Sequence, residues 1–119
     1  MHIETFRDYC LSLPGVVESF PFGEDTLVLK VMGKLFSLAS LSNPWFHINL
    51  KCDPEKAIEL RENYESIILG WHMNKKHWNT VTFEFGELPD DLVIELTKHS
   101  YDLVVSKLTK KLKEEQKKL

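Results

Sequence analysis

The chain has 119 residues, of which 43% are apolar, and a formal charge of −3 at pH 7. This length supports one hydrophobic core and is too short for two ordinary domains. No stretch approaches the roughly 20 apolar residues of a membrane-spanning helix, and Glu4, Arg7 and Asp8 interrupt the continuous apolar region that a signal peptide needs, so we expect a soluble cytoplasmic protein that makes no membrane contact.

The first half of the chain predicts one helix followed by four strands. Apolar residues at helical spacing from Ile3 to Leu13 predict an amphipathic helix, which Pro14-Gly15 ends. Apolar and alternating patterns predict strands over residues 19–22, 26–32, 35–41 and 46–51. Gly33-Lys34 predicts a tight turn between the second and third strands, and Ser42-Asn43-Pro44 turns the chain before Trp45.

The second half predicts two helices on either side of one further strand. Asp53-Pro54-Glu55 favours a helix start, because it supplies a capping carboxylate, a proline at the first helical position and an acidic first turn. This helix runs to about Tyr64, and an irregular span leads to a strand over residues 78–85. Pro89-Asp90-Asp91 opens the last helix, whose apolar stripe continues to Leu108.

Four successive strands with short connections must pair mainly antiparallel, because parallel neighbours need crossovers of about a dozen residues or more. The α-β-β-β-β-α-β-α order therefore predicts a two-layer α+β fold with an antiparallel sheet of about five strands and helices packed on one face. Residues 1–108 form this single domain, and residues 109–119 are a Lys-rich helix extension or tail. The predicted core consists of Leu29, Val31, Phe36, Leu38, Ile48, Leu50, Val81, Phe83, Leu96 and Leu103.

The patterns that usually signal catalysis or a cofactor are missing from the sequence, which has no glycine-rich phosphate loop, no HExxH and no GxSxG. Cys10 and Cys52 form no CxxC pair, and His72 and His77 lack the cysteine or carboxylate partners of a zinc site. We expect no enzymatic activity, no metal and no cofactor. A nucleophile–base pair between Cys52 and His47 or His72 stays open from the sequence alone.

The segment from His72 to Trp78 holds two imidazoles, two lysines, an amide and an indole within seven residues. Donors this dense are costly to bury, so we expect a loop on a rigid scaffold. In one interpretation the loop binds nucleic acid: its lysines neutralise phosphates, its polar side chains donate hydrogen bonds, and Trp71 or Trp78 stacks on a base. The residues assigned to this contact are Lys51, His72, Asn74, Lys75, Lys76, His77 and Trp78.

In the other interpretation the same loop is structural. Met73 and one indole fill the core, Asn74 and His72 satisfy irregular backbone, and the lysines are only solvated. Trp78 alternates in phase with Thr80 and Thr82, which places it on the polar face of its strand unless a loop folds over that end of the sheet.

The charge is unevenly distributed along the chain. Residues 107–119 contain six lysines and two glutamates, a net charge of +4, so the residues before them carry −7. An acidic body argues against tight, general DNA binding, so any basic surface must be local. The lysine-rich end is typical of arms that attract nucleic acid, but lysines also suit the C-terminal pole of a helix and keep proteins soluble, and we favour this second interpretation.

Four ordered stretches resemble the MmcQ/YjbR family. They are Leu13-Pro14-Gly15-Val16 with Glu18, Ile48 to Glu55, His72-Met73-Asn74-Lys75 followed by Lys76-His77-Trp78, and His99 to Val104. The resemblance implies a compact α+β fold, similar to secretion chaperones, and DNA binding through a double-wing shape. We therefore hypothesise a non-enzymatic protein that contacts DNA weakly through the His72–Trp78 loop; the alternative is a module that binds an unidentified protein or a small ligand.

Overall fold

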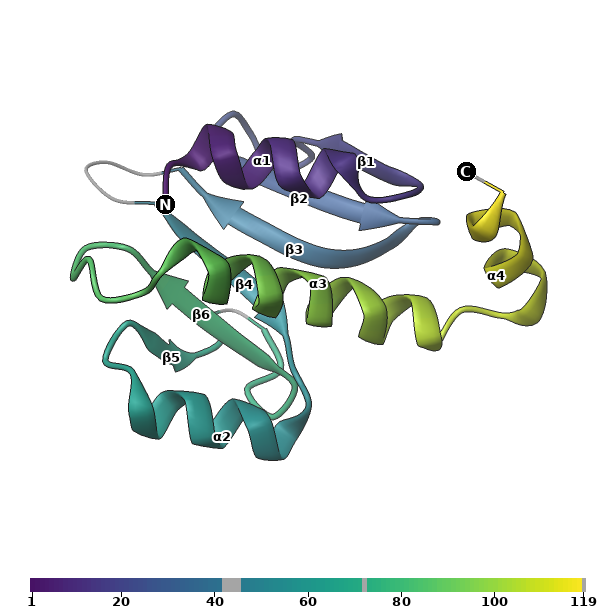
Figure 1. Cartoon of the computed structure of the whole chain (residues 1–119). Helices are drawn as coiled ribbons and strands as arrows, with labels where there is room; N and C mark the ends of the chain where they lie inside the picture. Colours follow the sequence, from purple (N-terminus) through teal and green to yellow (C-terminus); the bar gives the residue numbers. More distant parts are fainter. Residues whose placement is uncertain (42–45, 72, 119) are drawn as a thin grey trace.

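The computed structural model describes residues 1–41, 46–71 and 73–118, in which six strands form one sheet accompanied by helices (Figure 1). The elements are α1 (Ile3–Ser12), β1 (Val16–Ser19), β2 (Thr26–Val31), β3 (Lys34–Ser40), β4 (His47–Lys51), α2 (Pro54–Asn63), β5 (Ile67–Leu69), β6 (Trp78–Thr82), α3 (Asp90–Ser106) and α4 (Lys110–Lys117). Neighbouring strands pair antiparallel in the order β1-β2-β3-β4-β6-β5. Helices α1, α2 and α3 cover one face of this sheet (Figure 1). The predicted two-layer α+β fold is confirmed.

Two strands differ from their predicted positions, and a third is shorter than predicted, since β6 ends at Thr82 rather than at Phe85. β1 begins at Val16 rather than at residue 19, because Gly15, with a φ of 78°, turns the chain directly after α1 and lets Val16 pair with Val31. β5 lies in the span predicted to be irregular, since a strand of three residues is too short to show an alternating pattern. It forms by pairing with β6, so the sheet has six strands instead of about five.

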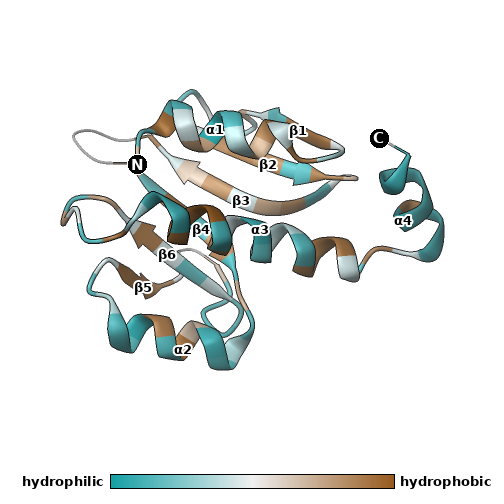
Figure 2. Cartoon of the chain, in the orientation of Figure 1, coloured by the Kyte–Doolittle hydropathy of each residue, from teal (hydrophilic) through white to brown (hydrophobic). Residues whose placement is uncertain are grey.

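The apolar stripe does not lie on one long final helix, because Leu108, its last residue, falls in the connection between α3 and a separate helix, α4. α3 ends at Ser106, and the Thr109 hydroxyl caps α4 by accepting a hydrogen bond from the Leu112 amide. Most of α4 is hydrophilic (Figure 2). It is attached to the body by a buried Gln116, whose Nε2 donates to the Tyr101 hydroxyl at 2.7 Å.

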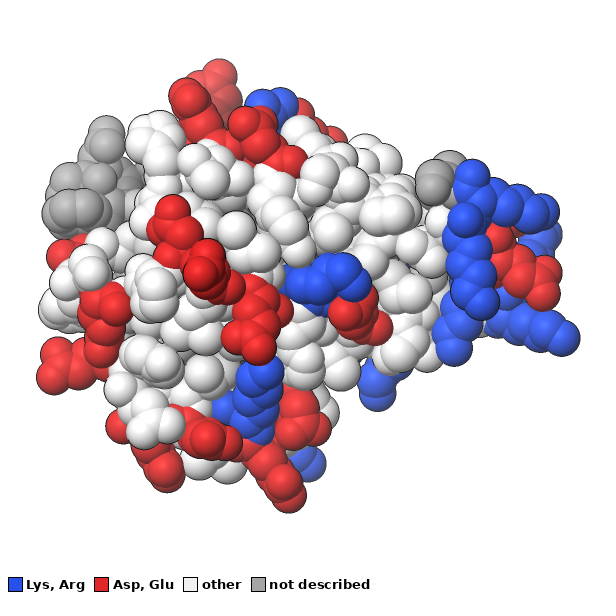
Figure 3. Space-filling model, in the orientation of Figure 1, with Lys and Arg blue, Asp and Glu red and all other residues white. Residues whose placement is uncertain are grey.

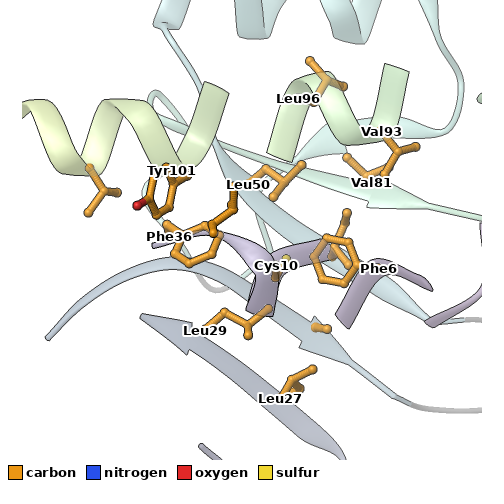
Figure 4. Close-up of a cluster of buried hydrophobic side chains, with 14 of the residues drawn as sticks. Phe6, Cys10, Leu27, Leu29, Phe36, Leu50, Val81, Val93, Leu96 and Tyr101 are labelled. Carbon is orange, nitrogen blue, oxygen red and sulfur yellow. The ribbon is translucent and has the colours of Figure 1, made fainter. Parts of the chain in front are cut away.

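The core lies between α1, α3 and the sheet (Figure 4). Of the predicted core residues, Leu38 and Leu103 are only half-buried, and the others are buried: Leu29, Val31, Phe36, Ile48, Leu50, Val81, Phe83 and Leu96. Leu38 lies between Ser37 and Ala39, which pair with core residues of β4, so alternation places it on the opposite face of the sheet. We call this the helix-free face.

We predict that Leu96→Ala lowers the free energy of unfolding by about 2–5 kcal/mol, because Leu96 is buried in this core and truncation leaves a cavity. Ile58→Ala on the outside of α2 is the control, since that side chain is 50% exposed. Urea denaturation measures both variants. A loss below about 1 kcal/mol for Leu96→Ala is typical of a surface position and contradicts the assignment.

Candidate functional site

The loop between β5 and β6 is anchored by its backbone. The Gly70 amide donates to the Trp78 carbonyl at 3.1 Å, and the Cys52 amide donates to the His77 carbonyl at 2.8 Å. Gly70 is required at its position because a Cβ there would lie 2.8 Å from the Trp78 carbonyl oxygen. Asn74 makes a local turn, in which its Oδ1 accepts from the Lys76 amide at 2.9 Å. Both ends of the loop and its turn at Asn74 are therefore held by hydrogen bonds.

The loop begins over the helix-free face. Thr80 is fully buried there, and its hydroxyl donates to Asn49 Oδ1 at 2.5 Å while accepting from the Trp71 amide at 2.9 Å. The Trp71 ring meets the His47 ring edge-on, with centroids 4.9 Å apart. These contacts explain why Asn49, a polar strand residue, is only 7% exposed on a face that no helix covers.

Most of the predicted site residues are brought together by this arrangement. Lys51 and Trp78 are cross-strand partners at the end of β4 and the start of β6, and both are half-buried. Asn74, Lys75 and Lys76 are exposed, and His77 is half-buried. The structure does not describe His72.

The side chains divide between the two interpretations of the loop. Asn74 serves the backbone, as the structural interpretation expects, whereas Lys76 has no ion pair within the described chain. Lys75 Nζ lies 3.3 Å from the Gly70 carbonyl, within hydrogen-bonding distance. Trp71, which remains 46% exposed, is a better stacking surface than the half-buried Trp78.

The two ends of the sheet carry opposite charge. Strand pairing places the β2–β3 turn, the end of β4 and the start of β6 at one end, which we call the lysine end. All lysines of the strands and of the connections before α3 lie there: Lys30, Lys34, Lys51, Lys75 and Lys76. The opposite, acidic end has Glu24, Asp25, Glu65, Glu84 and Glu87. This separation supplies the local basic surface that an acidic protein needs to bind an anion.

The cysteines are poorly suited to nucleophilic chemistry. Burial raises the pKa of Cys52 to about 11 and that of Cys10 to about 12, so both remain thiols at neutral pH. Alternation along β4 places His47 with Asn49 on the helix-free face, whereas Cys52 lines a small cavity of about 10 Å³ on the helix side. Within residues 1–41, 46–71 and 73–118, no group of three His, Cys, Asp or Glu side chains is arranged to hold a metal ion.

His99 of α3 is a residue that the site assignment missed. Its Nε2 accepts a hydrogen bond from the Asp53 amide at 3.3 Å, and Asp53 in turn caps α2 through the Lys56 amide. Burial and the nearby Lys56 ammonium lower the pKa of His99. The next residue, Ser100, accepts from the Lys51 amide at 2.9 Å. α3 thus positions the junction after β4, to which the loop is also attached through Cys52 and His77.

Comparison with known proteins identifies the fold and the family. The YjbR family model matches residues 11–103, and the chain therefore belongs to the YjbR family. It is similar to YbdF of Escherichia coli O157:H7, with 41% identity over 91% of this chain and 88% of that protein. It is also similar to YjbR of Escherichia coli K12, with 32% identity over 100% and 97% of the two chains.

Two solved structures have the same architecture. The crystal structure of Deinococcus radiodurans protein DR2400 matches with a TM-score of 0.87 and 40% identity, over 96% of this chain and 86% of that chain. The crystal structure of a Pseudomonas syringae protein matches with a TM-score of 0.75 and 26% identity, over 87% of this chain and 98% of that chain. These two proteins share the fold over most of this chain.

We predict that the free energy of unfolding decreases as the pH falls, because His99 becomes protonated. Because its folded pKa is lowered below the ordinary 6.5, the unfolded chain binds the proton more readily. The contribution of His99 is therefore fully present above about pH 6.5 and is lost as pH falls toward the folded pKa. His99→Gln should flatten the dependence of unfolding free energy on pH in this range, with His77→Gln as the control. An unchanged dependence in His99→Gln contradicts the prediction.

Proposed function

We propose that this YjbR-family protein binds nucleic acid weakly and without sequence preference, through Lys51 and the loop from Trp71 to Trp78. The observation that carries the proposal is the position of Lys75 and Lys76. They lie on a loop whose backbone is tied to β4 and β6, at the lysine end of a sheet whose other end is acidic. A loop whose ends are held by hydrogen bonds loses less conformational entropy on binding a phosphate backbone than an unattached segment does.

The chemistry available at this loop is phosphate neutralisation with one stacking surface. Lys51, Lys75 and Lys76 provide point charges, and the exposed Trp71 ring provides a plane for a base. Asn74 Oδ1 is already used by the Lys76 amide, so only its amide donors remain for a ligand. With about two to four phosphate contacts, the dissociation constant should lie in the non-specific range of about 10⁻⁴–10⁻⁶ M at physiological salt.

The double variant Lys75→Glu, Lys76→Glu should remove most of the binding and flatten its salt dependence by about two units of log K against log salt, because each neutralised phosphate contributes close to one. Fluorescence anisotropy of a labelled duplex, titrated at several salt concentrations, measures both quantities. The matched control is Lys56→Glu, Lys98→Glu, which changes the net charge equally on the helical face. Equal losses in the two variants contradict a site at the loop.

A second candidate function rests on the opposite face of the molecule. Helices α1, α2 and α3 border an open cleft of about 590 Å³, lined by Tyr9, Lys56, Asp91, Ile94, Glu95, Lys98, His99 and Asp102. Charged side chains of both signs lie over these helices (Figure 3). Such a mixed surface favours a small zwitterion or a protein partner over a polyanion. NMR titrations with two ligands separate the candidates. Duplex DNA should shift amides over the loop if the first holds, whereas a free amino acid, a small zwitterion, should shift amides around His99 if the second holds.

We also propose that the protein performs no covalent chemistry through its cysteines. At pH 7, iodoacetamide should alkylate Cys52 at least about 100-fold more slowly than a free cysteine of pKa about 8.5, because the pKa of about 11 leaves little thiolate. Mass spectrometry of the folded protein measures this rate, and Cys52→Ser identifies the modified site. Alkylation as fast as that of free cysteine contradicts the proposal, as does turnover abolished by Cys52→Ser or His72→Ala with the fold intact.

A further inference from the structure

The lysine end of the sheet continues into α4. The Tyr101 hydroxyl donates to the Pro14 carbonyl at 2.6 Å and accepts from Gln116 at 2.7 Å, so α4 docks beside the connection between α1 and β1. Two residues after Pro14, Val16 pairs with Val31, which leads directly into the β2–β3 turn with Lys34. Figure 3 shows the resulting concentration of lysine side chains over α4.

The docked helix directs its charges outward. Leu108 and Gln116 are buried and Leu112 is half-buried, so the less polar side of α4 faces the body. Lys107, Lys110, Lys111, Lys117 and Lys118 are exposed, and none forms an ion pair within the described residues. A helix that binds a bilayer surface inserts a free apolar face, which α4 lacks. A rod-shaped polyanion in solution requires only the exposed lysines.

We propose that α4 and the β2–β3 turn extend the phosphate-binding surface of the loop, so that the ligand is a polynucleotide long enough to contact the loop and α4 at once. This inference rests on the proposed function of the loop. The lysines of the loop and those of α4 lie at the same end of the sheet. The acidic end repels phosphates, so a polynucleotide is expected to bind at the lysine end.

The test compares a 24-base-pair duplex with a single-stranded tetranucleotide, using the full chain and three variants of equal charge change. The variants are Lys75→Gln, Lys76→Gln in the loop, Lys110→Gln, Lys111→Gln in α4, and Ile58→Glu, Asn63→Asp on the exposed side of α2 as the control. The α4 pair should weaken duplex binding several-fold and lower the salt slope by about two, while tetranucleotide binding stays unchanged. The loop pair should weaken both ligands.

The outcomes separate the two proposals. If the loop pair weakens binding and the α4 pair matches the control, the inference about α4 is overturned and the loop site stands. If neither pair differs from the control, the proposed function fails. The protein is also tested with vesicles of anionic phospholipid. If it binds them as tightly as the duplex, and the α4 pair weakens both equally, the surface is a membrane-binding one and the proposal of a polynucleotide ligand is overturned.

Gln116→Ala tests the docking of α4 separately from its charge. All lysines are retained, so the salt slope should change little, but the helix loses its polar tether to Tyr101 and duplex affinity should fall. Unchanged affinity with a demonstrably released α4 would contradict a docked contact surface. Proteolysis within α4 reports the release, and circular dichroism checks that the sheet and remaining helices are intact.

Discussion

The register of α3 on the sheet is the constraint on which the rest of the structure depends. Three successive side chains fix it through polar contacts: His99 to the Asp53 amide, Ser100 to the Phe36 carbonyl and the Lys51 amide, and Tyr101 to the Pro14 carbonyl. Apolar packing alone tolerates small displacements along a helix axis, whereas directional hydrogen bonds are lost when their partners shift. α3 thereby positions the end of β4, the start of α2 and the docking site of α4.

The candidate binding loop depends indirectly on the register of α3, through the residues that follow β4. Its last turn is attached to Cys52, which follows the residue that Ser100 holds, and its first turn is attached to Thr80 over the helix-free face. The Thr80 hydroxyl donates a hydrogen bond to Asn49 and accepts one from the Trp71 amide. The polar side chains of the helix-free face therefore hold the start of the loop. Lysines on this loop are therefore presented by a backbone with defined hydrogen bonds.

Separation of charge along the strands reconciles an acidic protein with a proposed anionic ligand. A uniformly mixed surface of net charge −3 would offer little attraction to a phosphate backbone. Here the pairing of strands gathers lysines from distant parts of the chain at one end, and α4 adds more beside them. Long-range attraction of this kind favours association and orientation more than tight affinity, which agrees with weak binding.

The sequence by itself determined the elements that have strong local signals and the strand residues that face the helices. Asp53-Pro54 predicted the start of α2, and alternation in β4 and β6 predicted Ile48, Leu50 and Val81 as core residues, since capping and the period-2 alternation of side chains are local properties. Only the tertiary structure decided the rest. β5 exists because β6 lies beside it, His99 acts through a residue 46 positions away, and the common position of Lys51 with Lys75 follows from strand pairing. These depend on contacts between segments far apart in the chain, which local periodicity does not encode.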